Sequence, residues 1–166
     1  AATIAVTPYS VTYDGQPHTA TGTAVGVLSE PLAGLALGGT THTLAGTYAA
    51  DGWTFTDVTG NYQDAAGTVS DVIAPASATI TVTGYSGVYD ASGHRASGSA
   101  VGADGSDLSG LLDLGAAFTN VPGGTASWSF AGDANHVASN GTVAIVLTKA
   151  AATIAGEQGA LAAITA

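Results

Sequence analysis

The chain has 166 residues, of which 8% are charged, and its 12 Asp and Glu against 2 Lys and Arg give a net charge of -10. A surface so poor in cations excludes nucleic acid and anionic lipid as partners, because phosphate binding rests on Lys and Arg. The chain has no cysteine, which excludes disulfides, iron–sulfur clusters and thiolate-zinc sites. No apolar run approaches the roughly 18 residues that a membrane-spanning helix needs, so we expect no membrane insertion.

The chain contains the same segment twice. Residues 3–14 return as residues 79–90, and residues 67–69 return as residues 141–143. A repeat period of about 75 residues suits a small domain rather than a solenoid repeat. The repeat predicts module 1 at residues 1–75, module 2 at residues 76–150, and at residues 151–166 the start of an incomplete third repeat or an extended tail strand.

Alternation of apolar and polar residues predicts strands in chain order. Residues 3–7 and 79–83 alternate β-branched residues with threonine or alanine, and residues 126–130 place Trp and Phe on one face. Residues 141–148 predict a long, largely buried last strand. Turn signals such as Asn140-Gly141 separate these runs. Short strands at regular spacing predict an all-β fold, with an Ig-like β-sandwich in each module.

One segment of each module departs from the strand pattern. Residues 107–114 carry leucines at helical spacing, and residues 30–35 are their counterpart, with Pro31 at a position that a helix start tolerates. Glycines within both segments weaken a helix. The sequence therefore predicts either a short helical turn or a leucine-rich loop that fills the end of the sandwich.

Two repeated motifs point to a family. The chain resembles the MBG and YDG repeat modules at Tyr13-Asp14-Gly15, at Tyr89-Asp90 and along residues 118–132. These are bacterial Ig-like modules of large secreted adhesins, and the resemblance covers both full copies. It implies an Ig-like sandwich, an extracellular or cell-surface location, and a role as a stalk or filament segment. The family has no catalytic residues to carry over, and module 1 departs from its pattern at residues 57–62.

Aromatic residues recur at matched positions of the two copies, which favours a structural role. The predicted core residues are Trp53, Phe55, Trp128, Phe130, Tyr13 and Tyr89. Each Trp precedes a Phe by two residues, on one strand face, which is typical of a core. A sugar-stacking platform of exposed Trp is the alternative. We expect the two tyrosines to lock a corner of the sandwich through a hydroxyl hydrogen bond.

The polar residues offer little chemistry. Asp104, Asp107 and Asp113 are weak calcium candidates, because carboxylates are the ligands that Ca²⁺ prefers, but they lack the EF-hand pattern and favour a solvated loop. No histidine has a second histidine at metal-ligand spacing. No Ser-His-Asp order is specific, and the acids fall mostly in predicted turns. We therefore expect no cofactor, no metal and no catalysis.

The last segment allows two interpretations. Residues 151–154 open like a first strand and then diverge, which indicates a boundary or the start of another module. Alternatively, this tail adds a strand to a neighbouring sheet edge through Thr153, Ile154, Leu161 and Ile164.

The sequence predicts a structural stalk or filament segment. Its expected partners are neighbouring like modules in the chain, with homo-oligomer or filament contacts as a further possibility. A self-assembling fibre subunit and a carbohydrate-binding module are the rival functions.

Overall fold

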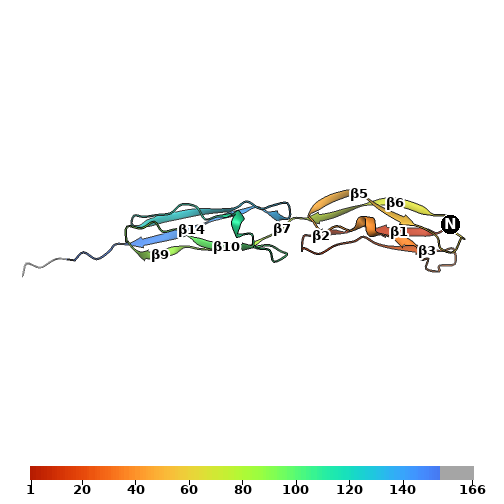
Figure 1. Ribbon diagram of the computed structural model, residues 1–166, viewed down its shortest axis with the longest axis horizontal. Coiled ribbons are helices and arrows are strands. Elements are labelled where there is room, and N and C mark those ends of the chain that lie inside the picture. Colours follow the sequence, from red (N-terminus) through yellow and green to blue (C-terminus); the bar gives the residue numbers. More distant parts are fainter. Residues whose placement is uncertain (154–166) are drawn as a thin grey trace, which may run out of the picture.

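The computed structural model describes residues 1–153 of the chain. The fold is all-β, as the alternation predicted, and its strands form two β-sandwich modules. Figure 1 shows the two modules lying end to end along one long axis. No strand of the first module pairs with a strand of the second.

Module 1 is built from two sheets. The first pairs β1 (Thr3–Thr7) with β3 (Thr21–Val25) in antiparallel register. The second has the order β2-β6-β5-β4, which are Ser10–Thr12, Ala65–Ala74, Gly46–Phe55 and Leu35–Ala36. In this sheet β2 runs parallel to β6, and the other pairs are antiparallel.

Module 2 repeats this arrangement. Its first sheet pairs β8 (Thr79–Thr83) with β10 (Ser97–Val101). Its second has the order β11-β12-β14-β9, which are Leu112–Asp113, Gly123–Phe130, Ser139–Thr148 and Tyr85–Val88. A short parallel pair, β7 (Ala76–Ser77) with β13 (His136–Val137), is added where the chain enters the module.

The first segment of each module serves both sheets, which closes the sandwich. Pro8 and Tyr9 separate β1 from β2, and Gly84 separates β8 from β9. Proline has no N–H to donate, so it interrupts a strand without leaving a donor unpaired. A side chain on Gly84 would collide with the Ala144 carbonyl, so the chain changes sheets there by a close backbone approach.

The two tryptophans occupy the same place in their modules. Trp53 on β5 pairs with Gly67 on β6, and Trp128 on β12 pairs with Gly141 on β14. Each indole lies across its glycine, because a Cβ added there would be 2.5 Å or 2.6 Å from the Trp Cζ2 atom. Both indoles are only partly buried. The glycine thus provides the space that the indole fills on the sheet surface.

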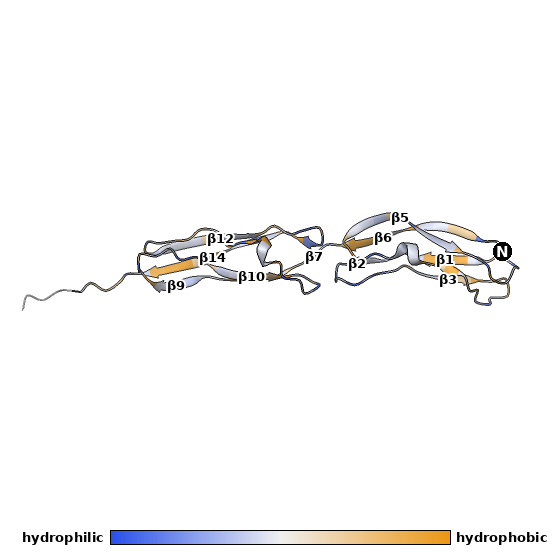
Figure 2. Ribbon diagram, in the orientation of Figure 1, coloured by the Kyte–Doolittle hydropathy of each residue, from blue (hydrophilic) through white to orange (hydrophobic). Residues whose placement is uncertain are grey.

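The centres of the modules are the phenylalanines rather than the tryptophans. Phe55 and Phe130 are 0% and 1% exposed. Ile73 on β6 and Ile145 on β14 are buried to the same degree, and Figure 2 shows these last parts of β6 and β14 as hydrophobic. The strand that carries the Phe and the long last strand are paired neighbours in the four-stranded sheet, so the core of each module lies against the inner face of that sheet.

The predicted short helices differ between the modules. In module 2 a 3₁₀ turn at Ser109–Leu111 lies within the predicted segment. In module 1 the segment 30–35 has no helix: Pro31 bridges to Val25 and Gly34 has a φ of 105°. The helical turn of module 1 comes later, at Gly38–Thr40. The left-handed glycine stops the helical turn that the leucine spacing suggested.

Candidate functional site at the junction between the modules

The covalent connection between the modules is one residue long. Strand β6 ends at Ala74, Pro75 follows, and β7 begins at Ala76. The Ala76 N–H donates to the carbonyl oxygen of Asn135 at 2.8 Å. Proline fixes its own φ, so the chain enters module 2 with little freedom to swing.

Side chains from both modules meet around this connection. The Tyr13 hydroxyl donates to Oδ2 of Asp104 at 2.9 Å, and the Tyr13 ring meets the His136 ring edge-on, with centroids 5.3 Å apart. The Ala45 N–H donates to Oδ1 of Asn135 at 2.9 Å. We call these interactions between the two modules the junction contacts. They leave Tyr13 only 6% exposed.

Local hydrogen bonds stabilise the Tyr-Asp turn. Asp14 accepts the Gln16 N–H at 2.9 Å and lies 2.9 Å from the His18 ring nitrogen, an arrangement typical of an Asx turn. Asp90 and His94 repeat the same pair in module 2. The backbone hydrogen bond, and then the histidine, lower the pKa of both aspartates. The turn therefore positions the preceding tyrosine at the far end of each module, opposite the chain entry.

Asp104 lies at the tip of the hairpin 102–106 that follows β10. The Ser106 hydroxyl and N–H donate to its Oδ1 at 2.6 Å and 3.0 Å. These bonds, followed by the bond from Tyr13, lower the pKa of Asp104 to about 2. The pKa of Tyr13 is raised, chiefly because its hydroxyl donates to Asp104. At neutral pH the junction therefore contains a charge-assisted hydrogen bond from a neutral phenol to a carboxylate.

The three calcium candidates are separate turn residues. Asp107 accepts the Ser109 N–H, and Asp113 accepts the Gly115 N–H, as Asp104 accepts that of its own turn. Within residues 1–153 no group of three or more His, Asp or Glu side chains is placed to hold a metal ion. The sequence placed these carboxylates near one another along the chain, but each one caps its own loop.

Tyr89 is not a core residue, contrary to the sequence-based expectation. It is 40% exposed, although it is the repeat equivalent of the buried Tyr13. Tyr13 packs against Ile73 of its own module, and Asp104 and His136 of the next module cover it further. The expected corner hydrogen bond within one sandwich is therefore wrong for Tyr13, whose hydroxyl bonds across the junction.

The predicted strand-adding tail is mostly beyond the described part of the chain. Thr153 is exposed and lies in no strand. Ile154, Leu161 and Ile164 lie outside the described residues, so strand addition stays a prediction.

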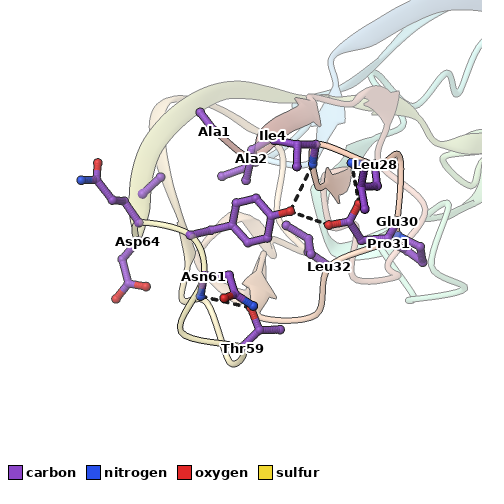
Figure 3. A pocket seen from close by; sticks show the side chains of 14 residues that line it. Ala1, Ala2, Ile4, Leu28, Glu30, Pro31, Leu32, Thr59, Asn61 and Asp64 are labelled. Atoms are coloured by element: carbon purple, nitrogen blue, oxygen red, sulfur yellow. Dashed lines mark hydrogen bonds between the residues drawn. The ribbon is translucent and has the colours of Figure 1, made fainter.

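The near end of module 1 carries a cavity, drawn in Figure 3. The Tyr62 hydroxyl donates to the Glu30 carboxylate and accepts the Val27 N–H at 3.1 Å. Leu28, at the hairpin tip beside it, is 86% exposed. This end face therefore combines exposed apolar side chains with polar ones, and one tyrosine holds the hairpin in place.

Module 2 presents an equivalent face to the junction. There the Ala103 N–H donates to Nε2 of His136 at 3.2 Å, which matches the bond between Val27 and Tyr62. His136 thus stands where module 1 has Tyr62, and Asp104 stands where module 1 has Leu28. Only the module 2 version offers a carboxylate to the tyrosine of a preceding module.

A second polar cluster lies inside module 1. Asp71 on β6 is fully buried; its Oδ1 accepts the Tyr9 N–H at 2.9 Å, and its Oδ2 has no partner. Burial, and then the neighbouring Asp51, raise the pKa of Asp71. Asp51 in turn lies 2.9 Å from the His42 ring nitrogen. The sequence alone does not reveal this cluster, because each of its residues is a single polar residue in a strand or loop.

The junction residues Ala45, Asn135 and His136 were also missed as a set. One signal was present: His18 and His94 repeat, whereas His136 has no histidine at the matching place in module 1. A polar residue that breaks a repeat can mark a contact that only one copy makes.

Comparison with known proteins adds no relative. No protein-family model matches the chain, and no curated protein is significantly similar to it. The resemblance to MBG and YDG modules therefore rests on the motifs alone and stays a prediction. In the described part of the chain, no helix combines the length and apolar character needed to cross a bilayer.

Proposed function

We propose that the chain is a non-catalytic stalk or spacer segment of a bacterial extracellular, adhesin-like protein. The observation that carries this proposal is the junction: a one-residue connection at Pro75, reinforced by hydrogen bonds from Tyr13 to Asp104 and from Ala45 to Asn135. Two domains arranged end to end and held in direction by such contacts give the chain length, which is what a spacer supplies.

Stiffness is what distinguishes a spacer of this kind from a tether. A flexible Gly-rich linker has a mean span that grows only as the square root of its length. A row of folded modules grows in direct proportion to their number, provided that the junctions do not bend. The junction contacts restrict bending, because swinging module 2 away would expose Tyr13 and break its bond to Asp104.

The ionisable residues support a structural role. Every histidine of the chain pairs with an aspartate at 2.9 Å; the pairs are His18–Asp14, His42–Asp51, His94–Asp90 and His136–Asp133. Three of these pairs lie in turns or loops that they help to shape. The extracellular setting is supported by the acidic, cysteine-free composition and by the motif resemblance.

The carbohydrate-binding alternative is disfavoured by the tryptophans. Trp53 and Trp128 lie along their own sheets over Gly67 and Gly141 and are partly buried. A sugar-stacking platform needs an open aromatic face instead.

A fibre subunit is the second candidate, and one observation favours it. Both outer ends of the molecule expose apolar side chains: Val27 and Leu28 are 67% and 86% exposed, and Val88 and Tyr89 are 57% and 40% exposed. Light scattering on the full chain and on a chain that ends at Lys149 tests this candidate. Molar mass that rises with concentration for the full chain alone favours tail-mediated assembly.

The spacer proposal is tested by display on a bacterial surface. The full chain is placed between an outer-membrane anchor and a small epitope, and a Gly/Ser linker with the same number of residues serves as the matched control. We expect an antibody to reach the epitope through a layer of surface polysaccharide with the full chain and less well with the linker. Equal access for both would contradict the proposal, and binding of the displayed chain to a glycan array would favour the carbohydrate alternative.

A further inference from the structure

The Asp104 hairpin packs directly onto bare backbone at Gly15. A Cβ placed on Gly15 would lie 2.6 Å from the Asp104 Cβ and 3.3 Å from its Cα, so no side chain fits between the modules there. Gly15 also has a φ of +77°, the left-handed region that glycine adopts freely. The residue after Tyr13-Asp14 therefore controls how closely the next module approaches.

The other module carries alanine at this place. Ala91 follows Tyr89-Asp90 and has a φ of +64°, so its backbone makes the same turn as Gly15. At the far end of module 2, the Ala91 methyl group occupies the volume that corresponds to the one filled by the Asp104 tip at the junction. The turn itself thus tolerates alanine, and what alanine removes is the space for a partner.

We propose that Gly15 is the specificity-determining residue of the junction. It makes the Tyr-Asp-Gly turn at the far end of module 1 a receptor for a carboxylate-bearing hairpin tip, here Asp104. Ala91 closes the same receptor at the far end of module 2. The partner that the open receptor fits is the near end of a module whose hairpin carries aspartate at its tip.

A side chain at residue 15 would disturb all the junction contacts. Restoring ordinary van der Waals distance between a residue-15 Cβ and Asp104 requires the hairpin tip to move back. That movement stretches the 2.9 Å bond between Tyr13 and Asp104 beyond hydrogen-bonding range. The same rigid displacement of module 2 moves Asn135 away from the Ala45 N–H.

The consequence is a difference in stiffness along the molecule. The junction between modules 1 and 2 is fixed in direction, whereas a module docking on the Tyr89 face with an Asp104-type hairpin meets the Ala91 methyl group. A junction formed there would lack the close approach that fixes the first one. The inference rests on the proposed spacer function, because it assigns the residue that makes one of its joints stiff.

The test measures the width of a distance distribution between the modules. Because the chain has no cysteine, single cysteines at the exposed strand residues Thr68 and Thr142 accept spin labels for pulsed EPR. We expect a narrow distribution for the unmodified junction and one about twofold broader for Gly15→Ala, since domain motion is the default without a fixed interface. An unchanged width for Gly15→Ala would overturn the proposal.

Two substitutions serve as matched controls. Gly60 has a φ of +76° and nothing within 4 Å of an added Cβ, so Gly60→Ala imposes the backbone strain without the collision. Ala91→Gly changes the turn at the other end of the molecule. Both are expected to keep the narrow distribution, and broadening equal to that of Gly15→Ala in either one would contradict the assigned role.

A second variant keeps the test valid if Gly15→Ala weakens module 1. Asp104→Ala removes the carboxylate from an exposed tip and is expected to broaden the distribution and to return the NMR titration midpoint of Tyr13 toward that of a free phenol. A narrow distribution with an unmoved Tyr13 midpoint would refute the receptor. A broad distribution already in the unmodified chain would refute both the receptor and the stiff spacer, whereas a narrow one that survives Gly15→Ala refutes the receptor alone.

Discussion

The two modules share one strand arrangement but differ in the chemistry of their interiors. At matched places on the long last strand, module 1 buries Asp71 and module 2 buries Ile145. The neighbouring strand carries Asp51 opposite Val69 in module 1, and Ala126 opposite Val143 in module 2. The same sandwich thus forms around a polar centre and around an apolar one.

The polar centre is accommodated by local changes. Strand β5 has a register shift between Tyr48 and Asp51, where β12 pairs without interruption. The His42 ring stacks on Tyr48 with centroids 3.5 Å apart and an interplanar angle of 3°. At the matching bridge in module 2, Phe118 replaces the histidine and packs over Gly124. The strand order is therefore the same in both modules, whether the buried residues at these positions are polar or apolar.

The largest effect is expected when module 2 receives the buried aspartate that module 1 has at the matched position. Ile145→Asp places a carboxylate where module 2 has Ala126 and Phe118 instead of Asp51 and His42. We expect module 2 to lose about 3–5 kcal/mol, because an uncompensated buried charge and a lost apolar side chain both act. Denaturant unfolding in a Trp53→Phe background, followed by Trp128 fluorescence, measures this loss. A loss below about 1 kcal/mol would show that module 2 tolerates a polar centre as well.

The Trp–Gly pairs that the two modules share should respond equally to the same substitution. Gly67→Ala and Gly141→Ala each push a methyl group against an indole, at 2.5 Å and 2.6 Å from Cζ2. We expect each to destabilise its module by about 1–3 kcal/mol, which is typical of overpacking. Thermal unfolding followed by tryptophan emission reports module 1 in a Trp128→Phe background and module 2 in a Trp53→Phe background, because each module has one Trp. A large effect in one module and none in the other would mean that the tryptophans are not equivalent.

The polar centre of module 1 should make its stability depend on pH. The folded state raises the pKa of Asp71, chiefly through burial, so the folded state binds this proton more tightly than the unfolded chain does. The stabilisation is fully present below the ordinary Asp pKa of about 4 and is lost as the pH rises through the raised value.

Asp71→Asn removes this dependence. The amide oxygen still accepts the Tyr9 N–H, and no charge is buried at neutral pH. We expect the melting temperature of module 1 to rise by a few degrees at pH 7 and to become flat across the mildly acidic range, with module 2 as the internal control. A lower melting temperature at pH 7 would show that the charged carboxylate is favourable.

The smallest expected effect is that of calcium. Asp104, Asp107 and Asp113 each cap a separate turn, so adding Ca²⁺ or a chelator should leave both melting transitions almost unchanged. Differential scanning calorimetry with and without millimolar calcium measures this. A shift of several degrees that Asp107→Ala abolishes would reveal a site that these turns form only with the metal bound.

The sequence predicted the parts of the fold that depend on repetition and alternation. The strands around Trp53 and Trp128 and the all-β class follow from patterns that local chemistry enforces. The last strand of module 2 is long, as predicted, but it begins at Ser139, so Asn140-Gly141 lies within it rather than in a turn, and only one of its faces is buried. Of the two alternatives predicted for the leucine-containing segments, module 1 follows the loop at residues 30–35 and module 2 the helical turn at Ser109–Leu111; leucine spacing alone could not decide between them, because it does not report the positive φ of Gly34. The polar centre was not predicted, since Asp51 and Asp71 meet only after the strands pair.

The candidate site was the least predictable part. Tyr13 and Tyr89 are equivalent by repeat, yet one is buried and the other is exposed. The difference comes from Asp104 and His136, which contact Tyr13 from the other module; Asp104 is 91 residues from Tyr13 along the chain. The repeat predicts the strands of each module, whereas the junction depends on residues that differ between the two modules, such as Asp104 and His136.

The most direct test of the central claim measures residual dipolar couplings for the backbone amides of the full chain in a weakly aligning medium. We expect the couplings of residues 1–74 and of residues 76–148 to fit alignment tensors of equal magnitude and common orientation, because the junction contacts hold the modules as one stiff unit. Two tensors that differ in magnitude would show that the modules reorient independently, and would contradict the account.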